Sequence, residues 1–407
     1  MSFTAAIFAV TYLGMVFGRL PGVKVDRAGI AMVAAVLLAV GGEVNLESLA
    51  GALHFPTLLL LAGLMVLSAR FEAAGFYNVL VARISQQVAR PVVLLALTVA
   101  VGGVLSALLV NDIVVFAMTP LLCQGLRGRG LDPRPFLAGL AAASNAGAAA
   151  TLIGAPQNIL IGELGGLDFW GFLTRCGPPA LAALVVVFGV VALVWRRALS
   201  ATPGLPVVME VSHDRTQTVT ATVAFLALLA LFATPLPRAE SALLVAAALM
   251  ISRKVASRDT ITAINLPLIV LFAGLFVVND AFAATGLGAD VLAWLAAHGL
   301  LPNRIALLAP LSLVLGNTIG NVPAVMLILS QWQDVSSATL VGLALFSTLA
   351  GNLLLVGSLA NLIVAERANA FGVQFSFLDH ARAGIPITLL SMLFAAFWLI
   401  ANGWMAL

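Results

Sequence analysis

The sequence contains very little charge. Only 9% of its 407 residues are Lys, Arg, Asp or Glu, whereas 62% are hydrophobic. Soluble domains carry about 25% charged residues, so this composition indicates an integral membrane protein. Cysteine is scarce as well, because Cys123 and Cys176 are the only two and both lie in or beside apolar segments. Cysteines so placed provide neither a disulfide framework nor the spacing of metal ligands, and we expect no metal site.

Catalytic signatures are missing too. The sequence has no H-E-x-x-H, P-loop or G-x-S-x-G motif, and an enzyme inside the membrane would need catalytic groups at depth. The four histidines, His54, His213, His298 and His380, fall in predicted loops or at the ends of apolar segments. We therefore predict that the protein is not an enzyme. We expect no nucleic-acid partner and no cofactor, with the exception of a coupling Na⁺ or H⁺.

Long apolar segments dominate what is present. A spanning helix needs roughly 20 residues, and ten segments reach or approach that length: 2–18, 28–42, 53–69, 136–162, 177–195, 218–234, 239–252, 264–283, 338–365 and 384–406. Two further stretches, 91–125 and 303–330, are too long for one helix, and each contains an Asn-bearing break. Irregular backbone at membrane depth persists only where protein or a water-filled cavity satisfies it. We predict that both stretches are re-entrant hairpins.

The basic residues predict an orientation. With the N-terminus outside and each hairpin returning to its own side, seventeen basic residues fall inside and three outside, which is the expected cytoplasmic excess. The three outside are Arg175, Arg238 and Arg304. The seventeen inside are Arg19, Lys24, Arg27, Arg70, Arg83, Arg90, Arg127, Arg129, Arg134, Arg196, Arg197, Arg215, Arg253, Lys254, Arg258, Arg367 and Arg382. We predict a multi-pass protein of a bacterial-type inner membrane with both termini outside, in the periplasm.

The chain repeats itself. Residues 54–76 align with 265–287 at an offset of 211, and 151–160 align with 354–363 at an offset of 203. The hairpin tips match as Asn111 and Asn321. We predict a first repeat over 1–197 with an inner hairpin, a cytoplasmic linker over 198–217, and an inverted second repeat over 218–407 with an outer hairpin. Inverted repeats with broken helices are typical of secondary transporters, whose substrate site lies where the breaks meet near the membrane midplane.

The breaks carry residues suited to binding a small solute. N-termini of half-helices can hold an anion without Lys or Arg, and we expect no basic residue at mid-membrane depth. Asn side chains donate and accept, glycine permits close approach, and Pro156 and Pro323 interrupt helices. The predicted substrate-binding residues are Asn111, Ser144, Asn145, Thr151, Gly154, Asn158, Asn321, Gly357, Ser358 and Asn361. The predicted ion-coupling residues are Asp112, Asn111, Asn145, Asn321 and Asn352.

Asp112 is the most informative of these residues. A carboxylate inside the membrane is expensive and marks a functional position, so we favour a role in proton or cation coupling. The alternative is that Asp112 only caps a half-helix that begins at Ile113. For the repeat-related pair Asn158 and Asn361, a shared site and two structural amides remain equally compatible with the pattern. Arg70 is interpreted as the solvated inner end of its span.

Four ordered motifs resemble the ion transporter superfamily, which includes arsenite permeases, citrate–metal transporters, NhaD-type sodium/proton antiporters and divalent anion/sodium symporters. They are LLVNDIVVFAMTPLL, SNAGAAATLIGAPQNILIG, NTIGNVPAVMLIL and AGNLLLVGSLANLIVAERAN. IGAPQNILIG and GSLANLIVAERAN look most like the YbiR-type bacterial anion permease branch. The resemblance implies an all-α polytopic fold of about ten spans and two hairpins in two inverted repeats. It also implies, as is usual in the family, a homodimer that moves its substrate by an elevator-like step.

The hairpin tips differ from one branch of that superfamily. Sodium-coupled dicarboxylate members carry Ser-Asn-Thr at both tips, whereas this chain has Val110-Asn111-Asp112 and Gly320-Asn321-Val322. The first tip, with Asn-Asp, and the second, with Asn-x-Pro, are more similar to the arsenite permease pattern. We predict a secondary active transporter of a small anion, an oxyanion or a carboxylate, coupled to protons or sodium. The alternatives are arsenite or antimonite efflux, sodium/proton antiport and, last, an anion channel.

Overall fold

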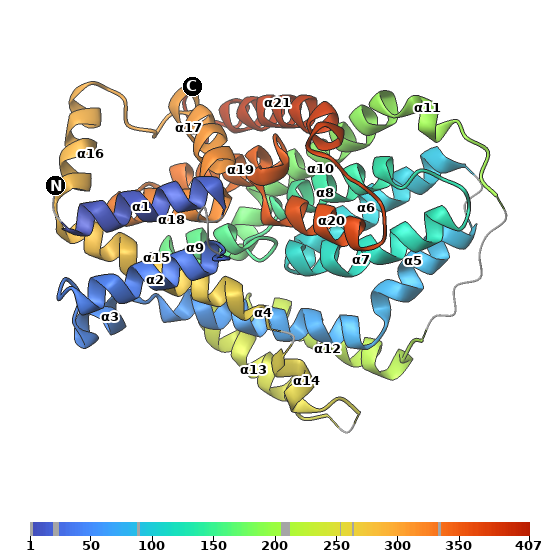
Figure 1. Ribbon diagram of the computed structural model, residues 1–407, viewed down its shortest axis with the longest axis horizontal. Helices are drawn as coiled ribbons and strands as arrows, with labels where there is room; N and C mark the ends of the chain where they lie inside the picture. Colours follow the sequence, from blue (N-terminus) through green and yellow to red (C-terminus); the bar gives the residue numbers. More distant parts are fainter. Residues whose placement is uncertain are drawn as a thin grey trace.

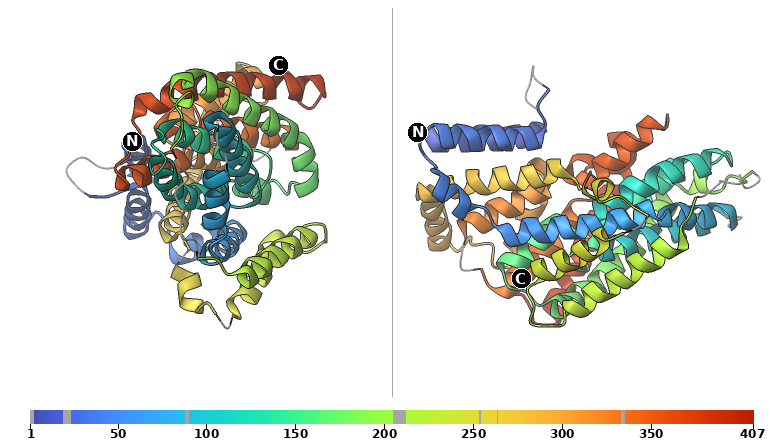
Figure 2. Two further views of the ribbon diagram at one scale, coloured as in Figure 1. Left: turned by 90° about the vertical axis from the view of Figure 1, so that its right-hand side faces the viewer. Right: turned by 90° about the horizontal axis from the view of Figure 1, so that it is seen from below.

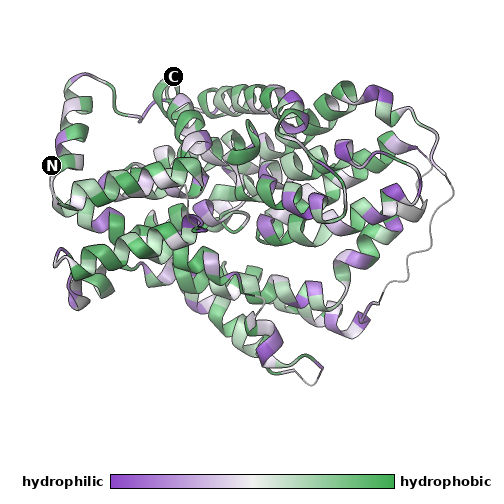
Figure 3. Ribbon diagram, in the orientation of Figure 1, coloured by the Kyte–Doolittle hydropathy of each residue, from purple (hydrophilic) through white to green (hydrophobic). Residues whose placement is uncertain are grey.

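The computed structural model describes residues 3–18, 24–87, 90–204, 212–252, 254–262, 264–332 and 335–407, and their regular structure is helical (Figure 1). Arg19, Arg253 and the centre of the predicted linker, 205–211, lie outside these residues. Hydrophobic residues cover most of the helices, and hydrophilic ones gather near their ends (Figure 3). Within the described ranges, five helices are long and apolar enough to cross a bilayer alone: α4 Phe55–Ala73, α6 Pro91–Leu108, α10 Phe169–Val194, α15 Leu266–Ala284 and α21 Phe377–Ala401.

The other predicted spans are shorter helices or pairs of helices. Four are single helices: α1 Phe3–Phe17, α2 Arg27–Val40, α12 Arg215–Leu231 and α13 Arg238–Met250. Two are interrupted in the middle: α8 Arg134–Ala148 with α9 Pro156–Leu164, and α19 Ser337–Ala350 with α20 Leu359–Ala370. Short helices join them: α3 Leu46–Ala52, α5 Phe76–Gln87, α11 Arg196–Leu199, α14 Ser257–Thr262 and α16 Leu287–Ala297. The expected all-α polytopic fold is confirmed.

Both apolar stretches with Asn-bearing breaks fold as helical hairpins. The first consists of α6 and α7 Asn111–Arg127, and the second of α17 Ile305–Thr318 and α18 Asn321–Gln331. In Figure 1 the first hairpin fills the right-hand half and the second enters from the left. The two tips turn differently. Gly320 adopts φ +96°, which favours glycine, whereas extended Leu109 and Val110 make the other turn.

The two halves of the chain interlock through a matched pair of helix contacts. A Cβ atom on Gly63 of α4 would lie 2.9 Å from the backbone of Ala242 in α13. A Cβ atom on Gly274 of α15 would lie 2.6 Å from the backbone of Ala31 in α2. Both glycines and both alanines are 211 residues apart, so the same contact is made twice, each time between one half and the other. Glycine is required because the backbones touch there.

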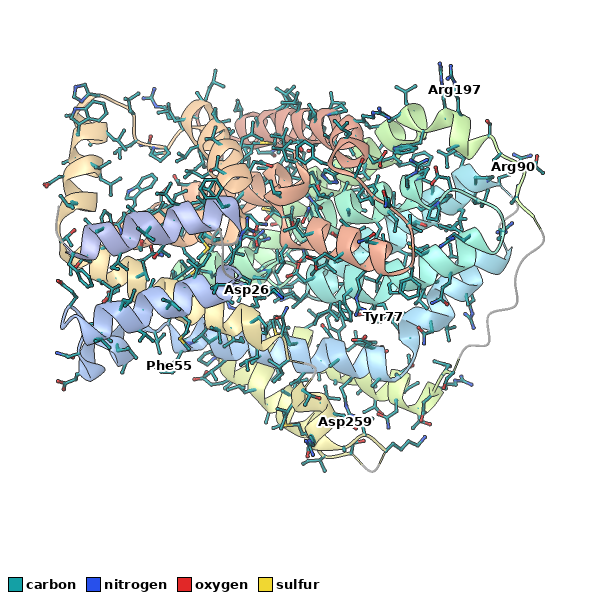
Figure 4. The ribbon with its side chains drawn as sticks, viewed as in Figure 1. Asp26, Phe55, Tyr77, Arg90, Arg197 and Asp259 are labelled. Atoms are coloured by element: carbon teal, nitrogen blue, oxygen red, sulfur yellow. The ribbon has the colours of Figure 1, made fainter. Side chains whose placement is uncertain are left out.

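Two arginines mark one end of the molecule. Arg90 and Arg197 lie at the right-hand end in Figure 4, and both chain termini lie in the left half of Figure 1. Helices α12 to α14 form one edge of the molecule in both views of Figure 2. We name the side of Arg90 and Arg197 the inner side, after the predicted orientation, and the opposite side the outer side.

The last helix begins earlier than the sequence predicts. Helix α21 begins at Phe377 rather than at 384, because Ser376 and Asp379 form a reciprocal capping box. His380 therefore lies in the first turns of the helix and is only 2% exposed. His380 thus lies at the end of its span, as expected of the four histidines, but it is buried there.

Candidate functional site

The two hairpin tips and the two broken spans meet in the interior. The backbone N–H of Asn111, at the first tip, donates to the carbonyl of Gly154 in the break between α8 and α9 (3.0 Å). A small cavity of about 10 Å³ lies at the meeting point, with room for about one water molecule. Its lining comes from both hairpins, α9, α15 and α20, and includes Asn111, Asp112, Gln157, Asn321 and Ser358. We name it the central cavity.

Asn145, at the inner half of the first broken span, is the centre of a buried amide network. Its Nδ2 donates to the Oδ1 atoms of Asn352 (2.9 Å) and Asn361 (3.1 Å). Its Oδ1 accepts from Ser358 Oγ (2.9 Å) and Asn111 Nδ2 (3.3 Å). Asn145 thereby joins one hairpin tip to the break in the other repeat. All four of its hydrogen bonds go to protein groups, so the role of Asn145 is to connect the elements around the site.

Asn158 and Asn361 make the same bonds in their two breaks. Asn158 Nδ2 donates to the carbonyls of Ala148 (3.0 Å) and Thr151 (3.1 Å). Asn361 Nδ2 donates to the carbonyls of Gly351 (2.8 Å) and Leu354 (3.3 Å), at the equivalent offsets. Breaking a helix leaves carbonyls without partners, and a buried one is costly. These two amides therefore satisfy their own breaks, which favours the structural alternative for the pair.

Several predicted site residues pack beside the central cavity rather than facing it. Ser144 donates to Ala141 O of its own helix (2.9 Å), and Thr151 donates to Ala107 O of the first hairpin (2.5 Å). A Cβ on Gly154 would lie 2.6 Å from Ala148. Two more serve the second break: Asn352 donates to Ala142 O (3.1 Å), and Gly357 lies against the amide of Asn317. The role of these residues is to bring backbones together.

Gln157 is a site residue that the sequence analysis missed. It lines the central cavity and is only 1% exposed. Its Nε2 donates to Thr348 Oγ1 (3.0 Å), while its Oε1 and the Oδ1 of Asn111 have no hydrogen-bond partner among the described residues. Its position beside Pro156, in the first turn of a half-helix, was the available signal. The buried groups left free in this region are therefore acceptor oxygens.

Asp112 separates the central cavity from a larger one. It lines both the 10 Å³ cavity and a cavity of 590 Å³ that we name the inner cavity. The inner cavity lies between α4, the first hairpin and α14, and Asp259 of α14, labelled in Figure 4, lines it. The capping alternative is wrong, because α7 begins at Asn111 and its N-cap is Val110, with no side-chain cap bond. Asp112 is 5% exposed.

Two arginines lie closer to this region than the sequence predicts. Arg70 lines the inner cavity and is 4% exposed, so its interpretation as a solvated helix end is wrong. Arg27 donates to Met15 O (3.2 Å), and its Nη1 would lie 3.3 Å from a Cβ on Gly320, at the tip of the second hairpin. A basic residue that the sequence places in an inner loop therefore lies beside the tip of the second hairpin. Sequence spacing missed both residues because they occupy the ends of apolar segments.

His380 also belongs to the polar interior. Its Nε2 lies 2.9 Å from the carbonyl of Asn352 and 3.5 Å from Nδ2 of Asn361. A Cβ on Gly384, one turn later, would lie 2.9 Å from Leu353 O, so α21 approaches the second break closely. The imidazole is therefore packed against the carbonyls that the break exposes.

Comparison with known proteins identifies the group to which this arrangement belongs. A model of the citrate transporter family matches residues 12–336, most of the chain. The silicon efflux transporter LSI3 of Oryza sativa subsp. japonica is 25% identical over 94% of this chain and 94% of its own length. The inner membrane protein YbiR of Escherichia coli (strain K12) is 33% identical over 35% of this chain and 38% of YbiR.

A solved structure has the same fold. The YdaH transporter of Alcanivorax borkumensis matches with a TM-score of 0.56 at 16% identity, covering 98% of each chain. This likeness concerns the fold alone. Together with the sequence matches it confirms the resemblance stated from the motifs, and the helical membrane architecture agrees with it. This multi-pass membrane protein belongs to the citrate transporter family of the ion transporter superfamily.

Proposed function

We propose that the protein is a secondary active transporter that moves a small anion, an oxyanion or a carboxylate, coupled to protons or sodium. The observation that carries the proposal is the position of Asp112. Asp112 lines both the central cavity and the inner cavity. A carboxyl group at such a boundary can take up a proton or a cation and expose it to one compartment at a time. The orientation with both termini outside is part of the proposal.

In alternating access, the open cavity and the packed region would exchange sides of the membrane. In this structure the inner side holds a 590 Å³ cavity, whereas a packed apolar cluster occupies the equivalent region on the outer side. The hairpins and broken spans would move as one body against α4, α15 and their partners, the elevator-like step that the superfamily resemblance implies. The matched Gly63–Ala242 and Gly274–Ala31 contacts support a rigid frame, because close-packed backbones resist shear. A homodimer, as in the family, would anchor that frame.

The coupling role has a direct test. Proteoliposomes containing wild type or Asp112→Asn are loaded with citrate, sulfate or malonate, and uptake is followed with imposed proton and sodium gradients in turn. We expect wild-type uptake of at least one anion to respond to one gradient. Asp112→Asn, which cannot take up a proton or offer a charge, should lose that response while still catalysing counterflow. Full gradient dependence in Asp112→Asn would contradict the coupling role. The absence of uptake of all three anions by wild type would contradict the substrate class.

A second candidate function is efflux of arsenite or antimonite. Two of the free buried groups beside the central cavity are acceptor oxygens, on Asn111 and Gln157. Such oxygens suit a hydroxylated, largely uncharged species such as arsenous acid, which donates hydrogen bonds. The silicon efflux relative is named for a similar oxyacid-forming element. Arsenite is added to the solutes of the same uptake experiment to separate the two candidates. Uptake of arsenite without uptake of any anion would favour the second.

A further inference from the structure

Arg70 of α4 holds a guanidinium group that is buried and only partly used. Its Nη2 donates to the carbonyl of Leu249, near the end of α13 (2.5 Å). Its Nε and Nη1 have no hydrogen-bond partner among the described residues, and the side chain is 4% exposed. A buried charged donor without partners carries the full desolvation penalty of its unpaired groups. Such a group retains a high affinity for any anion that can reach it.

The inner cavity is the route by which a solute would reach the guanidinium, whose Nε and Nη1 atoms are themselves covered by protein. That cavity has a volume of 590 Å³, within the range of small-molecule sites, and Arg70 is one of its lining residues. Arg238 provides a contrast, because its Nη1 and Nη2 donate to Leu167 O (2.7 Å) and Gly162 O (2.6 Å) and its Nε pairs with Glu163 (2.8 Å). Arg238 is a structural clamp with every nitrogen engaged. Arg70 has one nitrogen engaged and two left over.

The carboxylates that share the inner cavity set the conditions for anion binding. Asp259 is exposed, and Glu72 also lines an adjoining cavity of 340 Å³ together with Arg367. Asp112 is the buried carboxyl group. An ionised Asp112 would repel an anion held by Arg70, whereas a protonated or cation-bound Asp112 would not. Binding of an anion and neutralisation of Asp112 should therefore favour each other.

The equivalent position on the outer side is not basic. Ala281 of α15 aligns with Arg70 at the offset of 211 and belongs to a packed apolar cluster with Leu38 and Val278. Leu38 in turn aligns with Leu249, whose carbonyl accepts from Arg70. The repeated fold therefore does not require an arginine at this position, which is basic only on the inner side.

We propose that Arg70 forms an anion-binding site in the inner cavity, which receives a small oxyanion or carboxylate between the central cavity and the inner solution. The two free N–H groups would contact one or two oxygens of the anion, as an arginine fork does with carboxylates and phosphates. The anionic character of the ligand rests on the proposed function, whereas the free donors and the cavity do not depend on it.

The test measures binding without transport. Purified full-length protein is titrated with sulfate, phosphate and citrate at constant ionic strength set with sodium chloride, and thermal unfolding is recorded. At least one anion should raise the Tm of wild type, since a ligand that binds the folded state stabilises it. In Arg70→Gln the apparent Kd should rise roughly tenfold or more, and Arg70→Lys should lie between. Asp112→Asn should bind the anion more tightly than wild type.

Arg238→Gln is the matched control. It also removes a guanidinium group that holds backbone carbonyls, so it should lower the Tm while leaving the anion-induced shift unchanged. An equal anion response in Arg70→Gln and wild type, or no response to any anion in wild type, overturns the proposal. If Arg70-dependent binding is found but no anion is transported, the binding site stands and the proposed function falls. If anion transport is found without Arg70-dependent binding, the proposed function stands and the binding site falls.

Discussion

The inner and outer sides of this protein are built from equivalent helices yet differ in what fills them. On the outer side Val44 is buried in an apolar cluster with Ala281 and Leu38. On the inner side the aligned residues are Val255, which lines the inner cavity, and Arg70 and Leu249. Because the backbones are matched, the side chains decide which side is packed. The comparison teaches that aligned positions in matched helices can carry different side chains, which make the two sides chemically unequal.

Polar contacts also distinguish the two sides. The outer side is fastened by Tyr12, whose hydroxyl donates to Asn279 Oδ1 (2.8 Å) and lies 3.5 Å from Pro323 O of the second hairpin. The aligned position of Asn279 is Ser68, whose hydroxyl has no hydrogen-bond partner among the described residues. The second hairpin is therefore held to α1 and α15, and a corresponding tether to the first hairpin is not found in the described part of the inner side.

The largest expected effect comes from breaking the frame that both sides share. Gly63→Val and Gly274→Val each place side-chain atoms against backbone at less than contact distance. We expect each to lose roughly 3 kcal/mol or more of stability, because a packed backbone cannot yield to the added atoms. Yield and Tm of the purified variants measure this. Gly189→Val is the control, since a Cβ there meets no neighbour within 4 Å. Normal stability of Gly63→Val or Gly274→Val would show that the interlocked contacts can separate.

The two amides of the breaks provide the next largest effect. Asn158→Ala and Asn361→Ala each remove a buried amide that donates to two carbonyls of its break, and we expect each to cost about 2 kcal/mol. Because the bonds are equivalent, the two losses in Tm should be similar. The comparison is carried out with the transported solute absent. A loss confined to one variant would show that the two breaks are not maintained in the same way.

Loosening the outer side should have a moderate effect. Tyr12→Phe removes one buried hydrogen bond and leaves Asn279 Oδ1 unpaired, at a cost of about 1–2 kcal/mol. We expect the outer cluster to open more often. The rate at which a thiol reagent modifies Ala281→Cys, in a Cys123→Ser/Cys176→Ser background, should rise when Tyr12→Phe is added. Thr262→Cys in the inner cavity is the control, and its rate should stay the same. Equal rates at Ala281→Cys with and without the tyrosine would contradict the tether.

The smallest effect is expected at the surface of the inner side. Lys254 Nζ donates to Asp214 Oδ2 (2.6 Å), and this bond lowers the pKa of Asp214 below its ordinary value of 3.8. A carboxyl group with a lowered folded-state pKa stabilises the protein above the ordinary pKa, and the contribution is lost as the pH falls through the folded-state value. Lys254→Ala should therefore lower the Tm slightly at neutral pH and not at all in acid below both values. An exposed pair contributes little, so a large change at pH 7 would contradict this account.

The elements of the fold could be predicted from the chain because their causes are local. Hydropathy fixes the spans, and the rule that buried backbone must be satisfied turns the Asn-bearing breaks into hairpin tips. The start of α21 was misplaced because Asp379, His380 and Arg382 resemble a loop, whereas a capping box draws them into the helix. Of the predicted site residues, Asn111, Asp112 and Asn321 line the central cavity. Their roles in transport remain proposals.

Sequence alone determined the membrane class, the order of spans and breaks, and the family, because composition, periodicity and motif order are properties of the chain itself. Only the tertiary structure decided which polar atoms are used up and which remain free. Asn145, Asn158 and Asn361 use their hydrogen bonds on the breaks, whereas the oxygens of Asn111 and Gln157 and two nitrogens of Arg70 do not. That difference depends on how distant helices are rotated and packed against one another, and a buried donor or acceptor is free only when no such neighbour reaches it.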